Sequence, residues 1–327
     1  MPITSKLSEI TIPHRSFHDV FFESIEKYGN STALINHDTK QTMTYAEIKE
    51  KAEYVAKGLL FLGLQKGEVV ILCVPNCPEF VYLFMGISMA GGIVSPLHPD
   101  FRVDEMRLQV NNSMARFAFT VPSAIDTLSI VFSEMDEDHR VVCIGEREEA
   151  HGYLILSDLS RCTASDPPGY PEICSEEDLV FLPYSSGTFG PRKGVAITHY
   201  TYNAMIGVFN NVNEYIVPAR GENIIARISF HGSLGRDVLF SALFNGATVI
   251  TSLDTRPVAL AEHIQLYSVR SLFVTPRMLI KLCEAVQSNH LHLSSLINII
   301  TGNASMDEAK MRMALSTLPN VQHFDHG

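Results

Sequence analysis

The sequence has 327 residues, of which 46% are hydrophobic, and its formal net charge at pH 7 is −11. A chain of this length and hydrophobic content can bury a large core, and it predicts two packed subdomains rather than one. The negative charge leaves no broad cationic face for a phosphate backbone, so nucleic acid and anionic membranes are not expected as partners. Any polyanion must therefore be bound at a local site.

The cysteines give no sign of a metal site or of a disulfide framework. Six cysteines are scattered without paired metal-ligand spacing, and no apolar leader follows Met1. This usage predicts free thiols in a reducing compartment, so we expect a cytoplasmic or peroxisomal protein and not a secreted one. Cys73 and Cys77 lie close together, but no second cysteine or histidine pair completes a tetrahedral zinc site.

The first elements predicted are a helix and a strand. Thr44 and Glu47 form a capping box, and apolar residues at helical spacing continue the helix until Gly63. Residues 66–76 read as a turn followed by a buried strand.

A long apolar run follows at residues 80–97 and carries no charge. Its length is that of a membrane span, but Gly91 and Gly92 interrupt it. A buried helix to about residue 90 and a short strand at 93–95 are favoured, which makes a βαβ unit in a soluble protein.

The following segments continue the α/β pattern. A helix is predicted over residues 104–114 and a strand over 117–121. Residues 134–149 are rich in charge and are expected to lie partly at the surface. Residues 162–178 are rich in Pro, Ser and Asp, and they predict a linker at a subdomain junction.

The last third of the chain predicts a helix and three further strands, at 199–212, 224–228, 247–251 and 271–275. The predicted fold class is therefore α/β, with two packed α/β subdomains whose mostly parallel sheets are flanked by helices. The approximate subdomains are 66–215, and 10–65 together with 216–327.

The most informative segment is a loop of small and polar residues that follows a predicted buried strand at 179–182. It runs through Ser185, Ser186, Gly187, Thr188 and Gly190 to Lys193 and Gly194. Small residues let backbone N–H groups turn toward one point, and with these hydroxyls and the ammonium of Lys193 they suit a polyphosphate. A Walker A loop is excluded, because Gly194 stands where that pattern needs Ser or Thr. Taken without its surroundings, the segment is also compatible with an ordinary surface loop.

Residues 184–195, YSSGTFGPRKGV, resemble the signature loop of the adenylate-forming (AMP-binding) superfamily of acyl-CoA synthetases, coumarate-CoA ligases and luciferases. The matching positions are Tyr184, Ser185, Ser186, Gly187, Thr188, Gly190, Lys193, Gly194 and Val195. Phe189 and Arg192 depart from the pattern, which usually has threonine and proline there. Phe189 removes a hydroxyl and adds bulk, whereas Arg192 adds a charge. Further segments are similar to the family in the same order, at residues 43–48, 66–80, 89–101, 228–235, 274–282 and 301–306.

The resemblance implies the N-terminal domain of an acid-CoA ligase that uses ATP, Mg2+ and coenzyme A as co-substrate. In that reaction a small-molecule carboxylic acid attacks the α-phosphate of ATP, pyrophosphate leaves, and coenzyme A captures the acyl adenylate. Catalysis of this kind is positioning together with charge stabilisation. The implied roles place Lys193 and the amides of residues 186–190 on the β and γ phosphates and Thr188 near the magnesium ion.

Two further segments carry implied site residues. His231 matches a histidine beside the acyl and α-phosphate groups, although a lone histidine is also common as a satisfied core or surface residue. Gly302, Asn303 and Ala304 match a turn whose backbone packs on the adenine, and the alternative for them is an ordinary turn at the end of a strand. His323 and His326 lack the third ligand that a metal site needs.

The sequence stops at Gly327, where the resemblance predicts a Tyr-Gly-Met-Thr-Glu segment, and the family's C-terminal lid domain is absent from it. We therefore expect the chain alone to be an incomplete and inactive ligase. Three interpretations stay open: part of a longer active ligase, a short form that binds nucleotide or acyl ligand without turnover, and a structural or regulatory partner. Fatty, aromatic and short acids are all compatible with the sequence, and no protein partner is identified.

Overall fold

The computed structural model describes residues 9–135, 138–159, 169–185, 192–212, 218–302 and 304–326. The chain forms two compact units. Unit 1 contains Met1–Ile10, Tyr28–Tyr45 and Ile206–Gly327, and unit 2 contains Thr11–Lys27 and Ala46–Met205. These bounds differ from the expected division, because residues 11–27 and 46–65 group with unit 2, and the expected junction at 162–178 lies within that unit.

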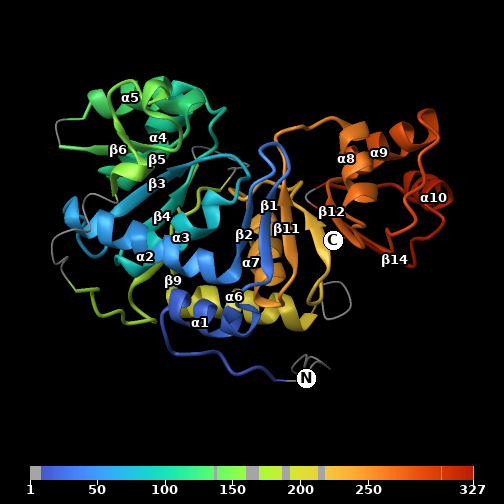
Figure 1. Cartoon of the computed structure of the whole chain (residues 1–327), viewed down its shortest axis with the longest axis horizontal. Coiled ribbons are helices and arrows are strands. Elements are labelled where there is room, and N and C mark those ends of the chain that lie inside the picture. Colours follow the sequence, from blue (N-terminus) through green and yellow to red (C-terminus); the bar gives the residue numbers. More distant parts are fainter. Residues whose placement is uncertain are drawn as a thin grey trace. The chain divides into compact units, whose positions relative to one another are not determined.

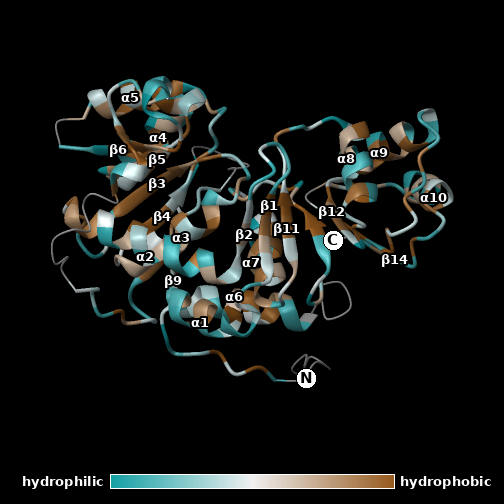
Figure 2. Cartoon of the chain, in the orientation of Figure 1, coloured by the Kyte–Doolittle hydropathy of each residue, from teal (hydrophilic) through white to brown (hydrophobic). Residues whose placement is uncertain are grey.

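Unit 2 is built on a seven-stranded sheet with the order β7-β6-β5-β3-β4-β8-β9. Its strands are Val69–Cys73 (β3), Ile93–Pro96 (β4), Phe117–Thr120 (β5), Arg140–Cys143 (β6), Leu154–Ile155 (β7), Leu179–Phe181 (β8) and Ile197–Thr198 (β9). Neighbouring strands are parallel except β8 and β9. Every residue of β3, β4 and β5 is buried, as expected for parallel strands covered on both faces, and Figure 2 shows β3 in the hydrophobic colour.

Helices cover both faces of this sheet. Val103–Ser113 (α4) and Pro122–Ser133 (α5) lie on one side, and Tyr45–Phe61 (α2) and Glu79–Met89 (α3) lie on the other (Figure 1). Gly86 lets α2 and α3 pack closely, since a Cβ there would lie 2.6 Å from Cβ of Val55 and 2.7 Å from the carbonyl oxygen of Ala52. This packing explains why residues 46–61 belong to unit 2.

Most elements expected in unit 2 are confirmed. The apolar run at 80–97 forms the buried helix α3 and the strand β4, and none of the described helices is both long and apolar enough to cross a membrane. Residues 134–149, expected partly at the surface, contain the strand β6 with Val141, Val142 and Cys143 buried.

The thiols of Cys73 and Cys77 lie in buried surroundings. Burial raises the pKa of the Cys73 thiol, to about 12, and that of the Cys77 thiol, so both stay protonated.

Unit 1 contains two smaller sheets. The first has the order β10-β11-β1-β2 and is formed by Asn223–Ile225 (β10), Thr248–Thr251 (β11), Thr32–Asn36 (β1) and Thr42–Thr44 (β2). The strands β10, β11 and β1 are parallel, and β2 is antiparallel to β1. The second is a parallel sheet of Ser271–Val274 (β12), Asn298–Thr301 (β13) and His323–His326 (β14).

The helices of unit 1 connect these parallel strands, as α/β crossovers do. They are Ser233–Phe244 (α7), Pro257–Leu266 (α8), Pro276–Ser288 (α9) and Glu308–Thr317 (α10). The helix Phe17–Ile25 (α1) lies in unit 2, and His199–Val212 (α6) has the predicted bounds. The strand expected at 224–228 ends earlier, at Ile225, because the N–H of Arg227 turns back to the carbonyl of Ile225 at 3.0 Å.

Candidate functional site

The glycine-rich loop of unit 2 begins and ends in a paired stem, which we define as residues 183–185 and 192–195. Tyr184 and Gly194 form an antiparallel bridge, and the N–H of Ser185 donates to the carbonyl of Lys193 at 3.0 Å. The N–H of Lys193 in turn donates to Oγ of Ser185 at 3.4 Å. The backbone of Lys193 is therefore held from both sides by Ser185.

The loop stem is also attached to helix α4. The hydroxyl of Tyr184 donates to Oδ1 of Asn112 at 2.5 Å, and burial raises the pKa of this phenol, so that it stays a donor. On the other arm the guanidinium of Arg192 lies 4.5 Å from the ring centre of Phe101 and 3.6 Å from Oε1 of Glu105. Arg192 thus makes contacts within the protein that the sequence did not reveal.

Of the predicted phosphate-binding residues of this loop, the structure describes Ser185 and Lys193. The side chain of Lys193 is exposed, and no carboxylate among the described residues forms an ion pair with its ammonium. A lysine with a fixed backbone and a free ammonium suits a phosphate group. Ser186, Gly187, Thr188 and Gly190, with Phe189, lie outside the described residues, and so does Asn303 of the other predicted segment.

His231 lies in unit 1, between β10 and the first turn of α7. Its Nδ1 is 2.7 Å from Oγ of Ser229, and its backbone N–H donates to the same hydroxyl at 3.3 Å. Phe230 beside it is buried, whereas His231 is half-buried. Ser229 therefore fixes the orientation of the imidazole ring.

Gly235 permits the tight connection from this segment into α7. A Cβ on Gly235 would lie 2.2 Å from the carbonyl oxygen of Ser229 and 2.7 Å from that of Ile228. Both of these atoms belong to the backbone and cannot move aside as a flexible side chain would. The close approach sets where the backbone of residues 228–231 passes the start of α7.

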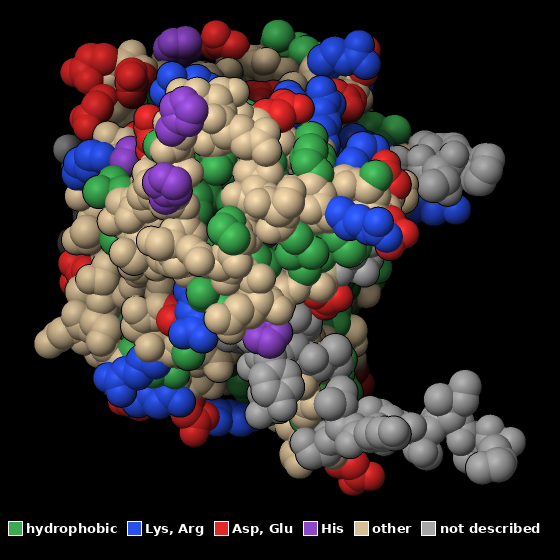
Figure 3. All heavy atoms as spheres, turned by 90° about the vertical axis from the view of Figure 1, so that its right-hand side faces the viewer, with side chains coloured by type: hydrophobic (Ala, Val, Ile, Leu, Met, Phe, Trp, Pro, Cys, Tyr) green, Lys and Arg blue, Asp and Glu red, His purple; other side chains and the backbone are tan. Residues whose placement is uncertain are grey.

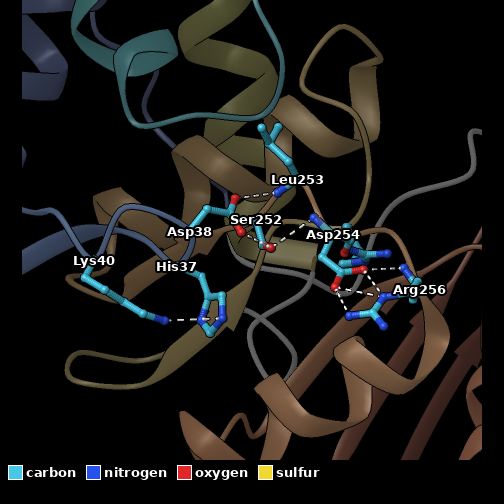
Figure 4. A network of polar contacts seen from close by, with 8 residues as sticks. His37, Asp38, Lys40, Ser252, Leu253, Asp254 and Arg256 are labelled. Carbon is cyan, nitrogen blue, oxygen red and sulfur yellow. Dashed lines mark hydrogen bonds and ion pairs between the residues drawn. The ribbon is translucent and has the colours of Figure 1, made fainter.

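A polar network that sequence reasoning missed lies where β1, β10 and β11 end (Figure 4). Asp38 accepts hydrogen bonds from Oγ of Ser252 at 2.9 Å and from the N–H of Leu253 at 2.7 Å. Arg227, two residues after β10, donates to the carbonyl of Asp254 at 2.7 Å. The network ties the segment that leads to His231 to the connection between β11 and α8, and no local sequence signal joins residues so far apart.

The turn at Gly302 follows strand β13. Gly302 is buried and Ala304 is exposed, and the neighbouring strands β12 and β14 run parallel to β13 and end level with it, at Val274 and His326. Ligands of α/β proteins bind at the carboxyl ends of parallel strands, which is where this turn lies. In β14, His323 is exposed, and the side chain of His326 lies outside what the structure describes. Among the described residues no three His, Cys, Asp or Glu side chains are grouped for a metal ion.

Comparison with known proteins matches almost the whole chain. A model of the family described as AMP-binding enzyme matches residues 21–324. The 4-coumarate–CoA ligase 2 of Petroselinum crispum is 30% identical over 324 residues, which are 97% of this chain and 58% of the relative. The 4-coumarate–CoA ligase of Pinus taeda is 30% identical over 308 residues, 92% of this chain and 56% of that relative. The chain therefore spans somewhat more than half the length of the curated relatives it matches.

Solved structures share the fold. A long-chain-fatty-acid-CoA ligase from Archaeoglobus fulgidus superposes with a TM-score of 0.87 at 22% identity, over 99% of this chain and 66% of that chain. The luciferase-like enzyme of Zophobas morio gives a TM-score of 0.84 at 19% identity, over 99% of this chain and 75% of that chain. These likenesses confirm the predicted α/β class with mostly parallel sheets flanked by helices.

Proposed function

Because the chain belongs to the AMP-binding enzyme family, which its residues 21–324 match, we propose that it takes part in ATP-dependent activation of a carboxylic acid. The reaction would form an acyl adenylate and then an acyl-CoA thioester, which is the activity of an acid-CoA ligase. The observation that carries the proposal is the loop stem, in which both backbone polar groups of Lys193 are bonded to Ser185 while its ammonium is exposed.

In unit 2 the proposed task is to hold ATP with its magnesium ion. Lys193 and the amides of residues 186–190 would bind the β and γ phosphates, and Thr188 would lie near the ion. The net charge of −11 makes such a local cation the appropriate counter-charge, since the chain has no broad basic surface. The hydroxyl of Ser185 already accepts the N–H of Lys193 and so stabilises the stem.

In unit 1 the proposed tasks concern the acyl group and the base. His231 would lie beside the carboxylate and the α-phosphate and stabilise the charge that develops there, with Ser229 holding its ring. The backbone of Gly302, Asn303 and Ala304 would pack on the adenine, which is supported by the position of this turn at the end of a parallel strand. Coenzyme A is the proposed acceptor of the acyl group.

Lys193→Ala tests the phosphate site by calorimetry with MgATP. We expect binding to weaken by about tenfold or more, because a charge-assisted contact contributes about 1.5–3 kcal/mol. Lys281→Ala is the matched control, since it removes the same charge from an exposed position on α9. Equal affinities in both variants would refute the assignment of Lys193.

His231→Ala tests the acyl site by acid-dependent exchange of pyrophosphate into ATP, measured with the full reading frame to which this chain belongs, over a panel of fatty, aromatic and short carboxylic acids. Loss of a preorganised polar contact to the reacting group is expected to slow exchange about 10²-fold. The control is His292→Ala at an exposed position. Exchange at an unchanged rate in His231→Ala would show that another group stabilises the reacting carboxylate.

A second function is kept because Phe189 removes a hydroxyl from the loop pattern and adds bulk to a segment that would approach the phosphates closely. In that case the chain binds the nucleotide or an acyl ligand without turnover. In the protein made from the full reading frame, binding of MgATP without exchange for any acid of the panel would favour this function, whereas exchange with one acid would exclude it. Retention of a tagged chain in the cytoplasm or in peroxisomes would support the compartment that the cysteine usage predicts.

A further inference from the structure

The contacts of Arg192 point beyond the general phosphate site to the way in which Lys193 is positioned. Arg192 stands where the family's loop pattern usually has proline, and a cation so close to Lys193 could be read as a second phosphate ligand. The geometry points elsewhere. Its guanidinium lies over the ring of Phe101 at 4.5 Å and near Oε1 of Glu105 at 3.6 Å.

The second arm of the loop stem is attached to the same helix. Tyr184 donates to Asn112, which is seven positions after Glu105 in α4. Seven residues make about two helical turns, so both attachment points lie on one face of α4, about 10 Å apart. Each arm of the loop stem thus has one anchor on the same rigid element.

Glu105 is itself held in place. Its Oε2 accepts the backbone N–H of Arg102 at 3.1 Å in the capping box that begins α4, which leaves Oε1 for Arg192. The side chains of Arg192 and Glu105 are 32% and 34% exposed, so solvent screens this pair less than a fully exposed one. A fixed carboxylate can therefore restrain the guanidinium.

We propose that Arg192 is a positioning residue for Lys193, and that its clamp on Phe101 and Glu105 restrains the backbone where a proline would restrain it through its ring. Lys193 follows Arg192 directly and is bonded to Ser185 across the stem. With both arms anchored to α4, the ammonium of Lys193 starts from a fixed Cα, and less conformational entropy is lost when a phosphate binds. The inference rests on the proposed nucleotide site.

The test compares MgATP affinities of four variants of the 327-residue chain by calorimetry. Arg192→Ala should bind about three- to tenfold more weakly, in line with the cost of ordering a side chain. Arg192→Pro should restore affinity to within about twofold of the unsubstituted chain, because the ring fixes φ without any charge. Glu105→Gln should weaken binding in the same direction as Arg192→Ala.

Arg107→Ala is the matched control, since Arg107 lies on α4 and pairs with Asp104 and Glu134 instead of the loop stem. Its affinity should be unchanged. Arg192 and Arg107 line one open groove of about 670 Å³, so alanine at either position meets open space and is compatible with folding.

Three outcomes would overturn the clamp. Equal loss in Arg192→Pro and Arg192→Ala, or tighter binding in Glu105→Gln, would make Arg192 a direct phosphate ligand. Unchanged affinity in Arg192→Ala while Lys193→Ala loses binding would refute the clamp and leave the proposed function intact.

Amide hydrogen exchange gives a readout that does not need the nucleotide. The N–H groups of Ser185, Lys193 and Val195 donate across the stem, and they should exchange faster in Arg192→Ala but not in Arg107→Ala. If the unsubstituted chain does not bind MgATP, the proposed function fails for this chain, and amide hydrogen exchange alone tests the clamp. Unchanged hydrogen exchange of these amides in Arg192→Ala then overturns the clamp, and faster hydrogen exchange supports it.

Discussion

Single residues set the most exacting steric limits in this molecule, and Gly235 is the clearest case. We predict that Gly235→Ala lowers the free energy of unfolding by about 1–3 kcal/mol, the usual cost of overpacking, because its Cβ would meet the carbonyl oxygen of Ser229 at 2.2 Å. Urea denaturation monitored by circular dichroism measures this change.

Gly232→Ala is the matched control in the same segment, since its Cβ would lie 3.5 Å from that same oxygen, an ordinary contact. Its unfolding free energy should change far less. An equally small decrease in the free energy of unfolding in both variants would mean that the first turn of α7 can shift away from Ser229 at little cost.

Residue type and spacing identified Lys193 as a phosphate-binding residue but did not identify the contacts that hold the loop stem in place. A lysine among small and polar residues is visible in the sequence because an anion site needs those residue types together. Asn112, in contrast, is 72 positions from Tyr184, and no pattern within either segment indicates their contact. The role of Arg192 was also hidden, since the sequence shows its charge but not the carboxylate and the aromatic ring that it contacts.

At the scale of elements, two buried histidines join α1 to its neighbours in unit 2. The N–H of Phe17 donates to Nδ1 of His199 at the start of α6, at 2.9 Å. Nδ1 of His18 lies 2.8 Å from Oγ of Ser88 in α3. A nitrogen that accepts a hydrogen bond carries no proton, so the contact of α1 with α6 requires Nδ1 of His199 to be unprotonated.

We predict that the stability of the fold decreases in mild acid because of this pair. Burial lowers the pKa of His18 to about 4 and that of His199 to about 3, with the His18 charge adding to the second effect. Below the unfolded pKa, near 6.5, the unfolded chain binds protons that the folded chain does not. The contribution of the two neutral histidines to the free energy of unfolding is therefore fully present above pH 6.5. It is lost as the pH falls toward 4, by up to about 1.4 kcal/mol per pH unit for each histidine.

Urea titrations between pH 7 and 4 check this prediction. His199→Asn retains an acceptor for the N–H of Phe17 but does not titrate, so its stability should depend less on pH. His292→Asn changes an exposed histidine and should keep the full dependence. If His199→Asn kept the full dependence as well, the acid sensitivity would have to come from other groups.

The elements themselves were predictable to different degrees. The helix α6 and the strand β3 were found because their periodicity and flanking residues agree. The strand β6 was missed because the charged residues around it suggested surface, whereas its buried positions depend on pairing with β5. The early strand β1 has only five residues, and its partner β11 lies far along the chain, so a local window could not reveal the pairing.

For the molecule as a whole, the negative net charge predicts that it does not bind nucleic acid. On the face shown in Figure 3, Lys and Arg side chains lie among Asp and Glu side chains and form no continuous basic patch. With a net charge of −11, we expect no binding to a 30-base-pair DNA duplex at about 150 mM salt and about 10 µM protein, as measured by fluorescence anisotropy. A saturable rise in anisotropy that weakens with added salt would contradict this expectation.

The pairing of β1 with β11 also constrains how the chain can be made. Oγ1 of Thr248 donates to the carbonyl of Thr32 across 216 positions of sequence, and β1 lies between β11 and β2. A ribosome adds about 5–20 residues per second, so β11 is synthesised on the order of ten to forty seconds after β1 and β2. During that time β1 is paired only with β2, its other edge lacks β11, and Ala33 and Leu34, fully buried in the finished fold, lie in an incomplete sheet. The N-terminal hairpin of this protein is therefore a segment that a nascent-chain chaperone would be expected to shield.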